Sequence, residues 1–492
     1  MIKITNVGGN GAGEASHLAV QTLSGTEILT AMKNGSDNLE LIGWVYKNGA
    51  VTRAASPTAG EAQEVALALL GRKAITAVRS GSDNLLLISW EASSDLQNIT
   101  RLRDSGHMAG EASQIAIAAI NSSMVVTACR NGSGGLLLIC WGVNADGTFT
   151  RLGDSNPAGH APQAGEVSLV TIVNVGNNIV VTAVKNGSDN LELIGWRVSS
   201  DGKTIHRQNP IGETAGTVGE IALTTFGNAE TGQRGVITAV QNGAGNLLLI
   251  AWNVLDQGAG FQRLGDTSTL PANQRPGTAS HISISPSGNA SNSFLASMRR
   301  GSGDLELIAF TLNNNGGFTR DGDIGSSQGT DISETALCSF FGRAVTATRK
   351  AHYLNVGVWE VATVSQAQGV KTAAINQWFA TALADPARAD KLRGNWMKLI
   401  QAELPLSNDQ KEHLSLVPKE HAKELQSAIA MVVEKGGKIH IDRENEHSPG
   451  TLVVEPKSHG THTAEFSLPI FHCTFDANCR HWHCGWGPAK KK

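Results

Sequence analysis

The chain has 492 residues, a formal net charge of −3 at pH 7, and charged side chains at only 17% of its positions. A near-neutral balance excludes the broad basic surface that nucleic acids or anionic membranes require, so we expect neither as a partner. No stretch reaches the roughly 20 apolar residues that cross a bilayer, and the N-terminus lacks an apolar signal-peptide core. We therefore expect a cytoplasmic protein, or one exported without a classical signal peptide.

One hairpin text recurs along most of the chain. Its clearest copy, VKNGSDNLELIGW at residues 184–196, has a β-rich run, a turn of Asn and Gly residues that tolerate positive φ, and a second apolar run. Each copy ends on a large aromatic residue: Trp44, Trp90, Trp141, Trp196, Trp252, Phe310 and Trp359. These aromatic residues are 46 to 58 positions apart, which is the length that a four-stranded propeller blade needs.

The first and last copies are each incomplete. KITNVGG at residues 3–9 resembles the fourth strand of other copies but has no strands before it, whereas the copy that ends at Trp359 has no fourth strand. We predict that residues 2–7 complete the last blade and pair the two ends of the array. The predicted fold is mainly β, a closed seven-bladed β-propeller over residues 1–361.

The composition changes after Val361. Residues 362–456 are predicted to form a helical region, with Asp385-Pro386 as a helix start, that ends in a β-hairpin of KIHID and TLVVE. Residues 457–492 form a His/Cys-rich tail in which no helix or strand pattern is evident. We therefore predict a small α+β region followed by an irregular tail.

Two charged positions recur in register with the hairpin. A glutamate begins the first strand of most copies and a cation ends the second strand, so each blade is expected to pair a carboxylate with a cation. The pattern breaks where Glu220 faces Gln241 and where Arg299 faces Thr278. A repeated ion pair would be structural, whereas the broken pairs could receive a ligand at one mouth of the channel. The predicted ligand-binding residues are Glu220, Gln241, Thr278, Arg299 and Arg349.

The repeated aromatic residues allow two interpretations. Their flat rings suit the stacking of sugars, but the residue before each of them is small, which favours packing between neighbouring sheets. We favour packing. The same register places Cys129 and Cys140 in the core.

The tail concentrates side chains that bind soft or borderline metals. The predicted ligands of Zn²⁺ or copper are His472, Cys473, Cys479, His481, His483 and Cys484. Their spacing is not that of a standard zinc finger, and a disordered tail or a disulfide are the alternatives. No other cofactor is expected.

Two resemblances extend these predictions. The repeats of residues 2–361 resemble those of bacterial seven-bladed β-propellers, a group that includes lectins that bind sugars between blades. The text ALADPARADKLRGNWMKLIQAELPL, then KIHIDRENEHSPGTLVVEP and a short Cys-rich tail, is similar to nitrile hydratase-like leader domains of ribosomal peptide precursors. The second resemblance implies a tail that enzymes modify at Cys473, Cys479 and Cys484.

The chain contains no Ser/His/Asp grouping, phosphate loop or nucleotide fingerprint that we can recognise. We therefore predict a non-catalytic recognition scaffold, not an enzyme, whose propeller binds a glycan or a protein partner and whose tail binds a metal. One alternative is a peptide precursor or carrier with a modified tail. Another is a propeller enzyme that acts on carbohydrate, in which the repeated carboxylates perform acid/base chemistry.

Overall fold

The chain divides into two compact units, Met1–Val361 and Ala362–Lys492. The computed structural model describes residues 2–106, 108–156, 164–209, 212–228, 233–287, 292–325, 331–340 and 342–363, and shorter segments after them: 382–383, 389–392, 394, 399, 426–427, 429–430, 434, 437–442, 451–456, 466–467, 472–476 and 481–485. Among these residues, no helix is both long and apolar enough to cross a membrane.

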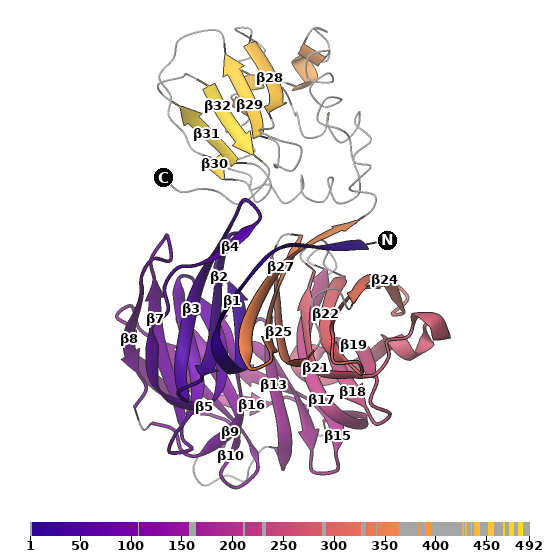
Figure 1. Ribbon diagram of the computed structural model, residues 1–492. Helices are drawn as coiled ribbons and strands as arrows, with labels where there is room; N and C mark the ends of the chain where they lie inside the picture. Colours follow the sequence, from indigo (N-terminus) through magenta and orange to yellow (C-terminus); the bar gives the residue numbers. More distant parts are fainter. Residues whose placement is uncertain are drawn as a thin grey trace. The chain divides into compact units, whose positions relative to one another are not determined.

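The first unit is built from four-stranded antiparallel blades that follow one another in chain order (Figure 1). Blades 1 to 4 consist of β1 (Ile2–Thr22), β2 (Glu27–Asn34), β3 (Asn38–Lys47) and β4 (Ala50–Arg53); β5 (Thr58–Leu70), β6 (Lys73–Ser80), β7 (Leu85–Ala92) and β8 (Ile99–Asp104); β9 (Ala112–Asn121), β10 (Met124–Asn131), β11 (Leu136–Val143) and β12 (Phe149–Asp154); and β13 (Val167–Gly176), β14 (Ile179–Asn186), β15 (Asn190–Val198) and β16 (Ile205–Arg207).

Among the described residues of this unit, three short 3₁₀ helices occur, and all of them follow strands of blade 5. Blades 5 to 7 consist of β17 (Glu213–Asn228), β18 (Gln233–Asn242), β19 (Leu247–Leu255) and β20 (Gly260–Asp266), with η1 (Asp256–Gly258), η2 (Thr267–Thr269) and η3 (Ala272–Gln274); β21 (Ala279–Pro286), β22 (Ser293–Arg300), β23 (Leu305–Leu312) and β24 (Phe318–Gly325); and β25 (Ile332–Phe340), β26 (Arg343–Lys350) and β27 (Tyr353–Thr363).

The long strand β1 closes the ring. It pairs with β27 of blade 7 and with β2 of blade 1, so its first half is the fourth strand of the last blade, as predicted (Figure 1). We call each boundary between neighbouring blades a seam and name it by its two blades. The same backbone hydrogen bond crosses every seam. At 2.8 to 3.0 Å, the amides of Ala62, Ala112, Val167, Val218, Ala279, Ile332 and Ala15 donate to the carbonyls of Asp37, Asp83, Gly134, Asp189, Gly245, Gly303 and His352. The last of these bonds, in the 7–1 seam, completes the circle.

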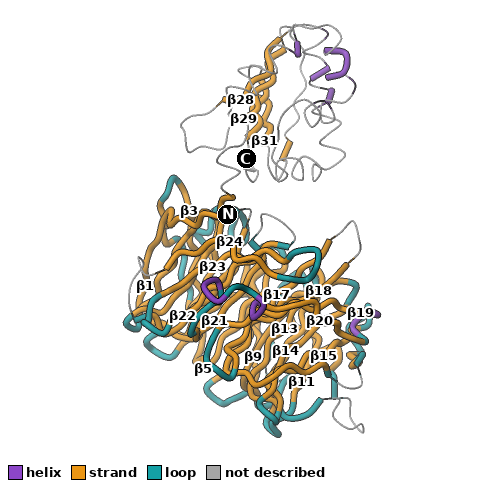
Figure 2. Tube along the Cα trace, turned by 90° about the vertical axis from the view of Figure 1, so that its right-hand side faces the viewer, coloured by secondary structure: helices purple, strands orange, loops and turns teal. Residues whose placement is uncertain are grey.

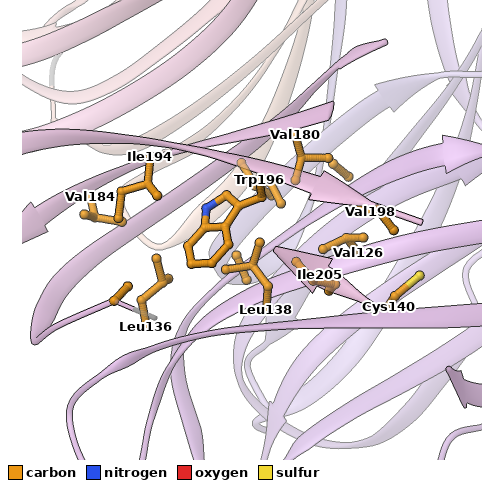
Figure 3. Close-up of a cluster of buried hydrophobic side chains, with 14 of the residues drawn as sticks. Val126, Leu136, Leu138, Cys140, Val180, Val184, Ile194, Trp196, Val198 and Ile205 are labelled. Carbon is orange, nitrogen blue, oxygen red and sulfur yellow. The ribbon is translucent and has the colours of Figure 1, made fainter. Parts of the chain in front are cut away.

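The repeated tryptophans are the centres of the packing between blades. Trp196 of blade 4 is fully buried among Leu136, Leu138 and Val126 of blade 3 (Figure 3). Its indole N–H donates to Thr182 Oγ1 at 2.9 Å, and the same bond recurs in five other blades. The packing interpretation is therefore correct, since rings that are at most 2% exposed cannot stack on a sugar.

Blade 6 is the exception to this tryptophan bond. Phe310 has no N–H to donate, and Ala296, which occupies the position of the threonine, has no hydroxyl to accept. Both partners are replaced together, so no buried polar group is left without a hydrogen bond at this position.

The second unit contains a five-stranded sheet in the order β28 (Gly437–Asp442), β29 (Thr451–Pro456), β32 (His481–Gly485), β31 (His472–Asp476) and β30 (Phe466–Ser467) (Figure 2). β28 and β29 form the predicted hairpin. The three other strands lie in the tail, where we had expected no regular structure, because short strands with few β-branched residues leave no clear alternation in the sequence. Most of the predicted helical region lies outside the described residues.

Candidate functional site

The repeated cations pair differently from the prediction. Lys185 Nζ lies 2.8 Å from Asp189 in the hairpin turn, and the same pair forms between Lys33 and Asp37 at 2.7 Å. Arg79 likewise pairs with a turn aspartate at 2.7 Å. The predicted pair with the glutamate at the start of the first strand is therefore wrong. The turn brings an aspartate four residues along the chain directly back to the cation.

The repeated glutamates instead cover the glycine of the turn. A Cβ atom at Gly35 would collide with the carboxylate of Glu14, and Gly81 and Glu61 have the same relationship. In these two blades the glutamate side chain therefore packs directly against the glycine of its own turn, in space that a Cβ atom would otherwise take. This contact explains the joint recurrence of the two residues without any ligand.

Glu220 does not belong to this glutamate series. In blade 5, Thr217 is the residue that precedes the seam amide, and Glu220 lies opposite Gln241 as Glu64 lies opposite Arg79 in blade 2. The Glu220 carboxylate accepts the amide of Ile282 in blade 6 at 3.0 Å. Glu220 therefore fastens two blades together, as Glu64 does with Ile115 at 3.1 Å.

The other predicted ligand-binding residues lie on three seams. At the 5–6 seam, Gln241 donates to the carbonyl of Ala279 at 2.6 Å, and the preceding Thr278 bridges to Asn246. Arg299 of blade 6 lies opposite Ser280, and not opposite Thr278 as predicted, just as Lys33 lies opposite Ser16 in blade 1. Arg349 lies at the 7–1 seam. The five residues thus do not form one site.

The 7–1 seam contains a pocket of about 420 Å³, which we call the closing pocket. It is lined by Glu14, Ala15, Ser16, Lys33, Asn34, Gly35 and Asp37 of blade 1 and by Arg349 and His352 of blade 7. Of these residues, Arg349 is one of the predicted ligand-binding residues. The two sides of the pocket come from opposite ends of the propeller sequence, so the pocket exists only in the closed ring.

The turn of blade 7 is one residue shorter than the turn of blade 1. Four residues separate Arg349 from its strand partner Leu354, whereas five separate Lys33 from Leu39. The shorter turn places His352 where the other turns carry Asp or Gly, and its φ of 77° lies in the left-handed region. The altered turn is visible in the sequence, but its position beside blade 1 is not.

His352 replaces a turn carboxylate by an imidazole. Arg349 Nη2 lies 3.0 Å from His352 Nδ1. Because a guanidinium group can only donate, this hydrogen bond makes Nδ1 the acceptor and leaves the proton of a neutral ring on Nε2. The charge of Arg349 is therefore not compensated by an aspartate in its own turn, unlike that of Lys33.

The closing pocket thus combines three kinds of chemical group. The exposed carboxylate of Glu14 can accept a proton, His352 can donate from Nε2, and Arg349 supplies a positive charge. Lys33 adds a second cation that is paired with Asp37. Such an arrangement can activate a water molecule and stabilise an oxyanion close to it.

The propeller cysteines do not contribute to this chemistry. Burial raises the pKa of the Cys129 thiol to about 12 and that of Cys140 to about 11, so both remain protonated at neutral pH. Cys338 is also buried, and its pKa is raised for the same reason. The prediction that Cys129 and Cys140 are core residues is correct.

The proposed metal ligands lie on the sheet of the second unit. Cys473 is the backbone partner of Cys484 on strands β31 and β32, and His483 and His481 pair with Thr474 and Asp476. Cys479 lies outside the described residues, and His472 is the first residue of β31.

No group of His, Cys, Asp or Glu that could hold a metal is found among the described residues. The metal site, with Zn²⁺ or copper, stays a prediction.

No protein-family model and no curated protein sequence matches the chain. Among solved structures, it is similar to the periplasmic gluconolactonase PpgL of Pseudomonas aeruginosa at 13% identity, covering 71% of this chain and 93% of that one with a TM-score of 0.44. A protein of Bacteroides fragilis named as a 6-phosphogluconolactonase has 12% identity, with coverage of 69% and 99% and a TM-score of 0.43. The SapL1 lectin in complex with alpha methyl fucoside has 11% identity, with coverage of 63% and 95% and a TM-score of 0.40.

The similar structures correct two predictions. We predicted a non-catalytic recognition scaffold and no enzymatic activity, whereas several of the similar structures carry the names of enzymes. The scaffold prediction and the prediction of no enzymatic activity are therefore withdrawn. At this low similarity, the substrates of those proteins are not assigned to this chain.

Proposed function

We propose that the propeller is a hydrolase that cleaves a sugar lactone or sugar ester in the closing pocket. The observation that carries the proposal is the replacement of a turn aspartate by His352. This replacement leaves the Arg349 charge without a carboxylate in its own turn and places an imidazole N–H donor beside it. Both groups lie in one pocket with the carboxylate of Glu14.

The reaction follows from the roles that these groups can take. Glu14 accepts a proton from water while the water oxygen bonds to the carbonyl carbon of the substrate. The negative charge that develops on the carbonyl oxygen is stabilised by His352 Nε2–H and by Arg349. The carbon–oxygen bond of the ester then breaks, and the leaving alkoxide takes the proton back from Glu14. One water molecule is consumed, and a carboxylic acid and an alcohol are formed.

A carbohydrate suits the remaining lining of the pocket. Ser16 and Asn34 offer a hydroxyl and an amide that can bind sugar hydroxyl groups, and Ala15 is the one apolar side chain in the lining. The alternative of glycosidic cleavage would need a second free carboxylic acid. Asp37, the other carboxylate of the pocket, is held in its ion pair with Lys33.

The test offers the protein a panel of aldonolactones and acetylated sugars. Hydrolysis is measured as the release of acid, by titration at constant pH. We expect the wild-type protein to hydrolyse at least one of these compounds, and Glu14→Gln to lose the activity. Glu166→Gln, the same substitution at the equivalent position of blade 4, is the matched control and should keep full activity. Equal rates for Glu14→Gln and wild type, or no hydrolysis of any lactone or ester by the wild-type protein, would refute the proposal.

A further inference from the structure

The side chains of blade 7 alternate between two seams. Ala347 packs in a cluster with blade 1, whereas Trp359 packs in a cluster with blade 6. Arg349 lies two residues beyond Ala347 on β26, so it faces blade 1 and the closing pocket. Tyr353 lies six residues before Trp359 on β27, which has no bulge along its pairing with β26. An even spacing puts two side chains on the same face of a strand, so Tyr353 lies on the blade 6 side, as Trp359 does.

The blade 6 side of Tyr353 carries an unusual combination of residues. Tyr353 is 53% exposed, and it is the one aromatic residue among the large apolar side chains exposed in the described part of the chain. Its partner across the turn is Lys350, which has the same parity and lies on the same face. The shortened turn of blade 7 thus presents an aromatic ring and a cation to the 6–7 seam.

Arg299 meets this face from blade 6. Arg299 follows Leu295 and Ser297 at intervals of two residues, so the three side chains lie on the same face of β22. Leu295 packs against blade 7, and Ser297 Oγ lies 3.1 Å from Thr335 Oγ1 of that blade. The turn position that holds an aspartate beside Lys33 is Gly303 in blade 6. The one carboxylate of this turn, Asp304, accepts a hydrogen bond from the Ser302 hydroxyl at 2.8 Å and precedes Leu305 as Tyr353 precedes Leu354, so it lies on the blade 5 side and not beside Arg299. Arg299 and Lys350 occupy, at the 6–7 seam, the repeat positions that Arg349 and Asn34 occupy at the 7–1 seam. Arg349 and Asn34 both line the closing pocket.

We propose that the 6–7 seam is a second carbohydrate subsite, which binds a hexuronate residue of an acidic polysaccharide. Tyr353 provides a flat face for the pyranose ring, and Arg299 with Lys350 binds the carboxylate. Asp331, which takes the place of Glu14 at this seam, leaves one net positive charge among the three charged groups. The subsite lies on the other side of blade 7 from the closing pocket and takes no part in the hydrolysis.

The 3–4 seam supplies a natural comparison for this subsite. Arg130 of blade 3 also precedes a glycine, Gly134, at the turn position of the aspartate. The positions of Lys350 and Tyr353 are, however, occupied by Asn186 and Asn190 in blade 4. The 3–4 seam therefore has the same glycine in its turn but neither the second cation nor the aromatic ring.

The test is calorimetric titration of the full chain with tetragalacturonate and tetramannuronate, with neutral galactotetraose as the reference. We expect at least one uronate to bind in preference to the neutral sugar. Arg299→Ala should weaken this binding about tenfold and Tyr353→Ala about fivefold, while Arg130→Ala leaves it unchanged. Unfolding temperatures close to that of the wild type confirm that the exposed substitutions leave the fold intact.

Three results would overturn the subsite: no saturable binding of either uronate, equal affinity for the neutral sugar, or equal loss in Arg130→Ala and Arg299→Ala. The proposed hydrolysis is tested separately, because Tyr353→Ala leaves the closing pocket untouched and should hydrolyse at the wild-type rate. Loss of uronate binding with retained hydrolysis supports the subsite, whereas loss of hydrolysis in Tyr353→Ala would contradict its independence from the closing pocket.

Discussion

The 7–1 and 3–4 seams share one frame but differ in chemistry. In both seams, a strand amide donates to a turn carbonyl of the preceding blade, from Ala15 to His352 and from Val167 to Gly134. Blade 4 also repeats the Lys and Asp pair of blade 1. The difference lies in the turn of the preceding blade, which offers a glycine in one seam and an imidazole in the other. In this propeller, the repeat builds the scaffold, and a departure from the repeat supplies the imidazole to which we assign a role in the proposed hydrolysis.

The largest effect is expected at the carboxylate of the closing pocket. Glu14→Gln removes the proton acceptor but keeps the shape of the side chain, so the hydrolysis rate should fall on the order of 10²–10⁴-fold. Glu166→Gln at the 3–4 seam should leave the rate unchanged. The measurement is kcat for the best lactone or ester substrate. Equal losses in the two variants would show that the glutamates act only through the stability of the ring.

A glycine at position 352 would make the 7–1 seam resemble the 3–4 seam. Because φ at His352 is 77°, His352→Gly should fold without strain. The loss of the imidazole N–H should lower kcat on the order of 10²-fold. A His352→Gly variant with the wild-type kcat would remove His352 from the mechanism.

Blades 4 and 6 offer a second comparison, on stability. Trp196→Phe removes the indole donor and leaves the buried Thr182 hydroxyl without this partner, so it should destabilise the protein by about 1–3 kcal/mol. Adding Thr182→Ala reproduces the Phe and Ala pair of blade 6 and should cost less than the sum of the two single changes. Chemical unfolding of the four proteins measures this coupling. Additive losses would mean that the hydrogen bond contributes nothing beyond packing.

The smallest effect is expected at the exposed turn ion pairs. Asp189→Asn breaks the 2.8 Å pair with Lys185, but the aspartate is 68% exposed and water screens the interaction. We expect a loss of at most about 0.5 kcal/mol, which decreases further at high salt. The unfolding temperature at low and high salt checks this value. A loss of several kcal/mol would mean that the turn pairs, and not the buried tryptophans, hold the blades.

The local parts of the propeller are readable from the sequence because they depend on short-range patterns. Alternating apolar residues and Asn-Gly turns specify each hairpin, and the repeat spacing specifies the blade. The orphan strand at residues 2–7 even predicts ring closure. The partners of the cations are less readable, because a turn that folds back over four residues brings Asp37 closer to Lys33 than the glutamate that the register suggested.

Pairing register limits what a repeat alignment can predict. Glu220 lies close to the place of the repeated glutamates in the sequence, yet Thr217 precedes the seam amide, and Glu220 pairs with the end of the second strand as Glu64 does in blade 2. Similarly, Arg299 lies opposite Ser280, as Lys33 lies opposite Ser16 in blade 1. Each first strand has a bulge near its start, and the sequence alone does not mark the residue at which the register shifts.

The blades, their order and the buried role of the tryptophans can be predicted from the sequence, because these features follow from patterns within about fifty residues. The position of a pocket cannot, because it depends on contacts that form when the ring closes. Ring closure brings together residues as distant as His17 and Glu334, 317 positions apart, whose backbone amide and carboxylate meet at 2.9 Å. The closing pocket and the 6–7 seam lie on the two sides of the one blade with a shortened turn. Successive side chains of that blade point alternately to blade 6 and to blade 1, and these two neighbours meet the blade only in the closed ring.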